Sequence, residues 1–404
     1  MAAGHSFKRL PPTSDHAPFD SPMSPIKILG SGLSALTLAL SLCIKEIPFK
    51  IYTKDCRPQK PLSNRHNYSL LLKASTIKDL RILLSITRDD FRKFLMVPST
   101  TPFPPDDLDN FEARVHRGRL EYLLRQDFEQ EIEWNCEIKA GTMGSPPLVF
   151  PPHVKDIKGH LTFDCMGVHS PIICADRYRS TESIVVFRGT SEVSKSLWNQ
   201  KFRGWFHGNE AQIQARFDNI VLQLIINNFS PDNGDVSLTC IYSRPCWGDM
   251  AESLDTLWLP TRSVDEASSP SLIAKFLNEI ELFRLDHELP EPYDEIFNPE
   301  NLKGNKIVHW LMRTKLTALP ELINLWRSSD EKVIKLGDAS YNMPIIGSTG
   351  AEFAIRDALD AAEEIEKDRG ASFPRWFIDR QDMKESQVTA CRRNLIEIHS
   401  EKNK

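Results

Sequence analysis

Apolar and polar positions follow a strand–helix–strand pattern over Pro25–Asp55. Two short, mainly apolar runs, Ile26–Leu29 and Phe49–Tyr52, have the length of buried strands. Between them, Leu33–Ile44 is apolar at helical spacing and begins directly after a glycine-containing turn. The stretch has about thirty residues, the size of one βαβ unit. The pattern therefore predicts an α/β fold with a Rossmann-like unit near the start of the chain.

The turn of this unit has the spacing of a dinucleotide-binding fingerprint. Gly30 can adopt the backbone angles of a tight turn, and Gly32 leaves space for a phosphate beside the backbone. Ala35 stands at the third position of G-x-G-x-x-G/A, where a small residue lets the helix pack on the strand. The free N–H groups at the start of the helix would attract a pyrophosphate. The competing interpretation is a buried helix after an ordinary glycine turn.

The middle of the chain is rich in predicted strands. Ser183–Arg244 contains β-like runs separated in part by turn signals such as Asp232-Asn233-Gly234, which predicts a mostly antiparallel second sheet. The runs are Ile184–Phe187, Gly204–His207, Ile220–Asn227 and Val236–Tyr242. A later strand at Val333–Leu336 precedes a glycine-bearing loop and a long helix at Glu352–Asp368.

Helical spacing is predicted in several other segments. These are Ile77–Phe94, Ala113–Glu131, Leu272–Leu285, Lys306–Trp326 and the charged C-terminal residues. The predicted organisation is a disordered tail at 1–24, a dinucleotide-binding domain in two parts, an inserted β-rich substrate domain and a C-terminal helical tail. The two parts of the dinucleotide domain are 25–182 and 331–368, the insertion is 183–330 and the helical tail is 369–404.

Composition excludes several classes of function. The 404 residues carry a formal net charge of −5 without a basic stripe, which argues against a nucleic-acid partner. Eight cysteines are scattered without a C-x-x-C pair or a zinc-type spacing, so we expect no metal site and a reducing, cytoplasmic location. The apolar run Leu29–Ile44 is too short to span a bilayer, and the first 24 residues lack the apolar core of a secretion signal.

Three separated stretches resemble one family, the FAD-dependent aromatic hydroxylases, or group A flavoprotein monooxygenases, typified by para-hydroxybenzoate hydroxylase. Gly30–Leu42, GSGLSALTLALSL, is similar to the family's ADP-binding fingerprint. Gly337–Ala362, GDASYNMPIIGSTGAEFAIRDALDAA, resembles its GD motif, and Arg117–Leu120 matches its R-x-x-L element. The resemblance covers the chain from Pro25 to about Lys367 and implies FAD as the cofactor.

The resemblance also implies roles for individual residues. Arg117 would approach the FAD phosphates, and Asp338, after Gly337, would bind the ribityl chain. Pro344 would face the flavin ring. Backbone N–H groups of the following turn would lie near the flavin pyrimidine and stabilise negative charge on the reduced flavin. The residues of that turn are Gly347, Gly350 and Ala351.

Two motifs depart from the family pattern. The family's middle motif, G-A-D-G-x-x-S-x-V-R, is matched only at Gly167 and Ser170, with Met166 in the acidic position and Ile173 in that of the arginine. The nearest acidic residue is Asp164. The carboxylate that usually ends the second strand and binds the adenosine ribose is also displaced, since Thr53 and Lys54 precede Asp55.

The implied reaction is hydroxylation of an aromatic, enolic or polyketide-like small molecule through a flavin C4a-hydroperoxide, with NADPH or NADH and O₂, in a setting such as secondary metabolism. No catalytic protein nucleophile is needed. Predicted substrate contacts are Arg203, Trp205, His207, Tyr242 and Arg244, although each residue type is also common in an ordinary sheet core. The alternatives are a flavin-binding isomerase, cyclase or pseudo-enzyme that does not use NAD(P)H, and a flavin reductase or oxidase acting on a lipid-like substrate.

Overall fold

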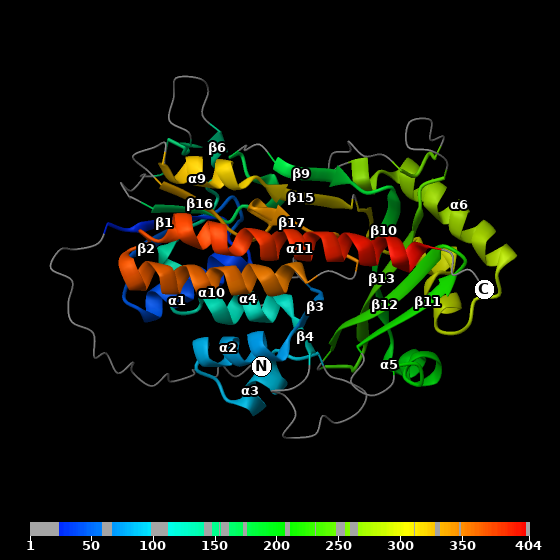
Figure 1. The fold of residues 1–404 in the computed structure, drawn as a ribbon. Helices are drawn as coiled ribbons and strands as arrows, with labels where there is room; N and C mark the ends of the chain where they lie inside the picture. The colour runs from blue at the N-terminus through cyan, green and yellow to red at the C-terminus, as the bar shows by residue number, and fades with distance from the viewer. Residues whose placement is uncertain are drawn as a thin grey trace.

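A computed structural model of the chain describes most residues from 24 to 400 (Figure 1). The described ranges are 24–58, 67–97, 112–140, 148–152, 154, 161–172, 176–206, 211–230, 232–247, 255–258, 266–310, 312–327, 332–346 and 349–400. The predicted N-terminal tail lies almost wholly outside them. Two sheets dominate the molecule, and they lie in different halves of it (Figure 1).

The first half is built on a five-stranded parallel sheet in the order β16-β8-β1-β2-β5. Its strands are β1 (Ile26–Leu29), β2 (Phe49–Tyr52), β5 (Ile132–Glu133), β8 (Leu161–Asp164) and β16 (Lys332–Lys335). The predicted βαβ unit is confirmed, with α1 (Leu33–Ile44) between β1 and β2. Because β16 comes from near the end of the chain, the sheet joins residues some 300 positions apart, as predicted.

Helices cover one face of this sheet. The side chains of Ile26 and Ile28 point into a core with α1 and α10 (Gly350–Asp368), which lie side by side with α4 (Arg117–Arg125) in Figure 1. On the opposite face, Tyr52 packs edge-to-face on Phe150, with ring centroids 5.0 Å apart. Smaller elements of this half are α2 (Ala74–Leu83), α3 (Arg88–Phe94), β6 (Lys139–Ala140), β7 (Leu148–Val149), α9 (Leu319–Arg327) and the hairpin β3 (Ser69–Leu72) with β4 (Ala113–His116).

The second half is an antiparallel sheet in the order β11-β12-β13-β10-β14. Its strands are β10 (Ile184–Val193), β11 (Gln212–Phe217), β12 (Ile220–Phe229), β13 (Val236–Pro245) and β14 (Ile307–His309). One face, which we call the outer face, buries Phe187 and Tyr242 against α6 (Pro270–Asp286). Shorter helices of this half are α5 (Lys195–Leu197), α7 (Tyr293–Ile296) and α8 (Pro299–Leu302).

The other face of this sheet, the inner face, is turned toward the first half. Val186 and Ile241 on it pack with Ile346, which follows the GD turn of the first half. The two halves are also linked by β9 (Asp176–Thr181), β15 (Arg313–Thr317) and β17 (Tyr341–Asn342), a three-stranded sheet. The predicted C-terminal helix is α11 (Phe373–His399), which runs along both halves and places His399 Nε2 2.9 Å from Ser243 Oγ.

Four predicted elements differ from those observed. The segment Ile77–Phe94 is not one helix but falls in two, α2 and α3. Gly204–His207 is not a strand where it is described, because Gly204–Phe206 follows a helical turn that packs through Trp198, Phe202 and Phe206. Lys306–Trp326 is not one helix but two strands, β14 and β15, followed by α9. Ala113–Glu131 likewise begins as strand β4, whose pairing with β3 outweighs the helical spacing of its leucines.

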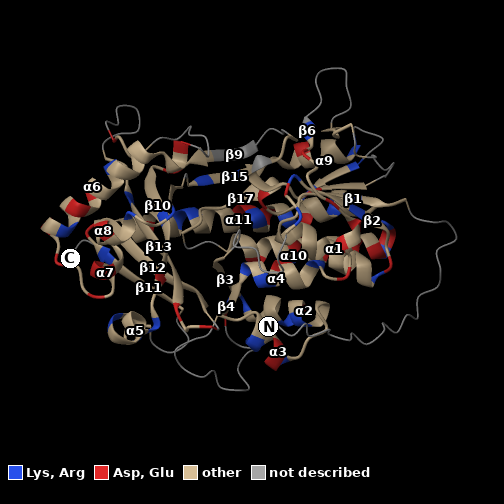
Figure 2. Ribbon diagram, turned by 180° about the vertical axis from the view of Figure 1, so that it is seen from behind, with Lys and Arg blue, Asp and Glu red and all other residues tan. Residues whose placement is uncertain are grey.

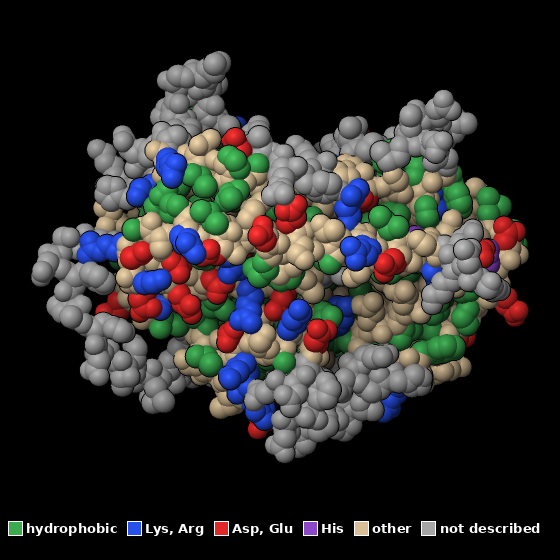
Figure 3. Space-filling model, viewed as in Figure 1, with side chains coloured by type: hydrophobic (Ala, Val, Ile, Leu, Met, Phe, Trp, Pro, Cys, Tyr) green, Lys and Arg blue, Asp and Glu red, His purple; other side chains and the backbone are tan. Residues whose placement is uncertain are grey.

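None of the described helices is long and apolar enough to cross a membrane. The face shown in Figure 3 carries acidic and basic side chains mixed together over α10 and α11 rather than a patch of one sign.

Candidate functional site

The glycine turn after β1 is tight enough to require Gly30. Its φ is +103°, and a Cβ at this position would lie 2.6 Å from the carbonyl oxygen of Cys165. The backbone holds the turn on both sides, since Gly30 N donates to Tyr52 O at 2.7 Å and Cys165 N donates to Leu29 O at 2.9 Å. Gly30 therefore fixes the path of the chain between three strands.

Gly32 has a different role, because it needs no unusual backbone angle. It is the N-cap of α1, with φ −77°, and no side chain caps the helix there. A Cβ on Gly32 would meet nothing within 4 Å among the described residues, so open space lies beside the helix N-terminus. Ala35, one turn later, is fully buried in the core. A helix start with open space beside it fits an anionic group such as a pyrophosphate.

A carboxylate also reaches this turn. Asp55 Oδ2 accepts a hydrogen bond from Ser31 Oγ at 2.5 Å, and Thr53 Oγ1 is 3.0 Å from the same hydroxyl. The bend after β2 thus brings the Asp55 side chain to the glycine turn, although Asp55 lies beyond the end of the strand in the sequence. Position counting along the strand could not show this, because the bend and not the strand places the side chain.

The GD turn packs directly on the glycine turn. Gly337 has φ +54°, and a Cβ there would lie 3.3 Å from both Ser34 Oγ of α1 and Ala354 Cβ of α10. The next residue, Asp338, lies beside Gly167 of the middle motif, where an added Cβ would be 3.9 Å from Asp338 Cβ. The first, middle and last motifs therefore meet at one edge of the parallel sheet.

Asp338 lies in a recess at this edge. Its side chain is exposed, yet burial among the surrounding protein raises its pKa, and the positive charge of Arg117 lowers it in part. A carboxylate that is accessible but enclosed is suited to accept hydrogen bonds from a ligand hydroxyl.

Replacing Asp338 by Ala is expected to weaken FAD binding without unfolding the protein, since the exposed carboxylate holds no described element together. Loss of one hydrogen bond to a charged group costs about 1.5–3 kcal/mol, roughly ten- to a hundred-fold in affinity. Titration of the apoprotein with FAD would measure the change, with the exposed Asp379→Ala as the matched control. An unchanged dissociation constant would remove Asp338 from the site.

Arg117 stands at the start of α4, near Asp338. Its Nε donates to Glu121 Oε1 at 2.7 Å, and its guanidinium also donates to the Tyr68 hydroxyl. Burial lowers the pKa of Arg117, but Tyr68 and Glu121 outweigh burial and raise it above its usual range. The side chain therefore remains a fixed cation close to the GD turn.

The middle motif is ordered by Asp164 rather than by an acid at position 166. Asp164 Oδ2 accepts from Ser170 Oγ at 2.5 Å, and Oδ1 accepts from Met166 N at 3.2 Å. The same carboxylate is 3.4 Å from Lys335 Nζ on the neighbouring strand, and both side chains are fully buried. Asp164 therefore holds the described part of this loop in place, although the usual acid at position 166 is missing.

The loop after the GD turn is described in part. Pro344 is buried and precedes Ile346, which contacts the inner face of the antiparallel sheet. Gly347 lies outside the described residues. Gly350 and Ala351 begin α10, whose N-terminus has no side-chain cap. No group of three His, Cys, Asp or Glu among the described residues could hold a metal ion.

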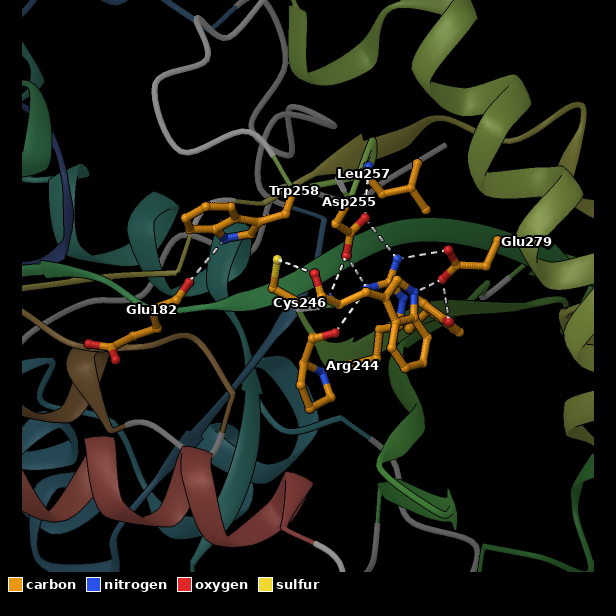
Figure 4. Close-up of polar contacts among 10 residues, drawn as sticks. Glu182, Arg244, Cys246, Asp255, Leu257, Trp258 and Glu279 are labelled. Atoms are coloured by element: carbon orange, nitrogen blue, oxygen red, sulfur yellow. Dashed lines mark hydrogen bonds and ion pairs between the residues drawn. The ribbon is translucent and has the colours of Figure 1, made fainter. Parts of the chain in front are cut away.

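The predicted substrate contacts do not meet at the inner face. Tyr242 and Arg244 lie on the outer face of β13, where Arg244 is fully buried between Asp255 and Glu279 (Figure 4). Its Nη1 donates to Asp255 Oδ2 at 2.5 Å, and the Tyr242 hydroxyl donates to Glu279 Oε1 at 2.6 Å. These contacts give both residues a structural role. Alternation along the strand could not assign their face without the register.

The other predicted contacts are also elsewhere. Arg203 and Trp205 are exposed in the turn that follows α5, and Trp205 is 44% exposed. His207 lies outside the described residues. On the inner face, the polar side chains instead include Arg188 of β10, Gln223 and Asn227 of β12, and Thr239 of β13.

Known proteins were compared with the chain. No protein-family model matches it. It is 26% identical over 371 residues to the FAD-dependent monooxygenase adaC of Aspergillus niger, covering 84% of each chain. It is 23% identical over 376 residues to the FAD-dependent monooxygenase nscC of Neosartorya fischeri, covering 85% of this chain and 87% of that one. The fold is similar to 2,6-dihydroxypyridine-3-hydroxylase from Arthrobacter nicotinovorans, with a TM-score of 0.66, 15% identity and 94% of each chain covered.

Proposed function

We propose that this chain is a divergent FAD-dependent monooxygenase, an FAD-binding oxidoreductase that hydroxylates an aromatic or enolic small molecule with NADPH or NADH and dioxygen. The main support for the proposal is that four groups suited to FAD lie together. The uncapped start of α1, the Asp55 carboxylate, the recessed Asp338 and the Arg117 cation lie at one edge of the parallel sheet, next to the inner face of the second sheet.

These residues fit FAD, and each would hold a different part of it. The start of α1 would bind the pyrophosphate, Asp55 the adenosine ribose and Asp338 the ribityl hydroxyls. Arg117 would approach the phosphates. Bound FAD supplies the redox and oxygen-activating chemistry.

The chain's own contribution is position and exclusion of water. An apolar wall forms where the GD loop packs on the inner face. It consists of Ile346 from the loop and Ile184, Val186 and Ile241 from the sheet. Such a wall would keep water from the reacting atoms, and Pro344 beside it would limit the movement of the loop. We assign substrate contact to polar side chains of the inner face, with Arg188 and Thr239 foremost, in place of Tyr242 and Arg244.

The ordered middle motif favours NAD(P)H use over the flavin-binding isomerase, cyclase or pseudo-enzyme. Asp164, Ser170 and Lys335 hold this loop in place beside Asp338. An ordered loop next to the cofactor edge is what transient binding of a reductant requires.

We predict that NADPH alone reduces the bound flavin slowly and that a substrate accelerates the reduction at least tenfold. Anaerobic stopped-flow on the FAD-loaded protein, followed through the visible flavin band, measures both rates. Probes are hydroxylated naphthoates and 2,6-dihydroxypyridine, with free FAD as the control. If neither NADPH nor NADH bleaches the flavin band while a probe is bound, the result would favour the non-hydroxylating alternative.

A further inference from the structure

Glu352, in the first turn of α10, caps a different helix from its own. Its Oε2 accepts a hydrogen bond from the backbone N–H of Lys73 at 3.0 Å, and its Oε1 accepts one from the Thr76 hydroxyl. Lys73 is the N-cap of α2, which has neither a capping side chain of its own nor an acid in its first turn. Glu352 therefore supplies, from 279 positions away, the carboxylate that the start of α2 lacks.

This contact leaves the start of α10 itself uncapped. Glu352 is the third residue of α10, the position from which a glutamate usually reaches back to the N-cap of its own helix. Here both carboxylate oxygens are engaged at α2, and Thr349, the N-cap of α10, makes no capping bond with its side chain. The family resemblance places the flavin pyrimidine near the N–H groups of Gly350 and Ala351, which belong to this uncapped start.

The Glu352 carboxylate keeps a negative charge in a buried place. The residue is 3% exposed, and the donors of both hydrogen bonds are neutral groups. Within the described part of the chain, the cation that reaches it is Arg356, whose Nε is 3.9 Å from Oε1 and whose guanidinium is already paired with Asp79 of α2. Two carboxylates therefore share one arginine, which leaves a net negative charge at the start of α10.

This charge lies beside the cofactor edge. Ala354, two residues after Glu352, packs on the GD turn, since a Cβ added to Gly337 would lie 3.3 Å from Ala354 Cβ. Figure 2 shows α2 below α10 in the half of the molecule that holds this edge, where the two helices approach each other. Reduction adds negative charge to the flavin pyrimidine. A fixed negative charge close to that ring opposes its reduction by Coulomb repulsion, which burial strengthens.

We propose that Glu352 lowers the reduction potential of the bound flavin, because its fixed charge destabilises the reduced form more than the oxidised form. The two hydrogen bonds at α2 hold the carboxylate in place and keep it from capping α10. This role rests on the proposed function for the cofactor, and not for the substrate or the reaction. Glu352 thus sets how readily the cofactor accepts electrons, whichever substrate the protein uses.

The test is the midpoint potential of the FAD-loaded protein, measured by equilibration with redox dyes of known potential. Glu352→Gln keeps the shape of the side chain and removes its charge. It should favour the reduced flavin about tenfold, which corresponds to a rise of about 30 mV for a two-electron couple. Glu352→Asp keeps the charge and shortens the side chain, so it should lower the melting temperature and move the potential much less.

Two further variants complete the design. Glu363→Gln removes an exposed carboxylate about three turns further along α10, so it is the matched control and should leave the potential unchanged. Arg356→Gln removes the cation 3.9 Å from the carboxylate, so it should lower the potential, opposite to the shift in Glu352→Gln. Because Arg356 is 35% exposed, this variant serves as the test if Glu352→Gln does not fold.

A folded Glu352→Gln protein with the wild-type potential would overturn the proposal. An equal shift in Glu352→Asp would also overturn it, since the effect would then come from the lost contacts and not from charge. If Glu352→Gln does not fold, an unchanged or raised potential in Arg356→Gln has the same consequence. The measurement needs no turnover. A shifted potential in a protein that hydroxylates nothing would refute only the proposed reaction, and an unshifted one in an active hydroxylase would refute only the role of Glu352.

Discussion

The Gly32→Asp variant is expected to fold normally and to retain no FAD. A Cβ at this position meets nothing within 4 Å, and the backbone angles suit any residue, so the new side chain does not strain the protein. Its carboxylate would, however, fill the space at the start of α1 and repel a pyrophosphate at close range. Affinity should fall below detection rather than by a modest factor.

The flavin content of the purified variant, together with its circular dichroism, measures this outcome. Gly204→Asp is the matched control, because a Cβ at Gly204 also meets nothing within 4 Å and that residue lies on an exposed turn of the other half. The control should bind FAD as the wild type does. A folded Gly32→Asp protein with a full complement of FAD would show that Gly32 is only a turn residue.

Replacing Arg244 by Met should lower the free energy of unfolding by about 3–5 kcal/mol, the cost of leaving buried charge without its partner. The Arg244 side chain is 0% exposed. Its removal takes the positive charge away from the Asp255 carboxylate, whose side chain is 2% exposed. Burial alone would raise the pKa of Asp255, but Arg244 lowers it below its usual value. This stabilisation is therefore present above the unfolded-state pKa and is lost as the pH falls through the lowered one.

Urea unfolding at neutral and at acid pH would measure both effects. Arg375→Met is the control, because that arginine is 79% exposed in a surface pair with Asp379 and should cost less than about 1 kcal/mol. The difference between wild type and Arg244→Met should shrink in acid. A variant of unchanged stability that fails to bind substrate would restore Arg244 to the substrate site.

The sequence indicated the cofactor edge well, because its signals are local. The turn around Gly30 and Gly32 and the turn at Gly337 and Asp338 each need particular residue types at fixed spacing, and their shared task requires them to meet. Asp55 was harder to assign, since a bend after the strand brings its carboxylate to Ser31.

The substrate face could not be assigned from the sequence, since it depends on the register of long-range pairs. Tyr242 and Arg188 are both polar positions in apolar strands, yet Arg188 pairs with Ile241 while Tyr242 pairs with Phe187, which places them on opposite faces. The one available signal was an arginine within the run Ile184–Val193. A charged residue in a buried strand needs partners, and one partner of Arg188 is the ring of Tyr68, more than a hundred positions away.

The central claim, that this chain inserts an oxygen atom, is tested most directly with isotopically labelled dioxygen. FAD-loaded protein is incubated with NADPH and 1-hydroxy-2-naphthoate or a related acid, and the product is analysed by mass spectrometry. The account predicts a product that gains one labelled oxygen atom, with the Gly32→Asp variant giving none. A product of unchanged mass, or one whose new oxygen comes from water, would contradict it and indicate an isomerase, a cyclase or an oxidase on the same fold.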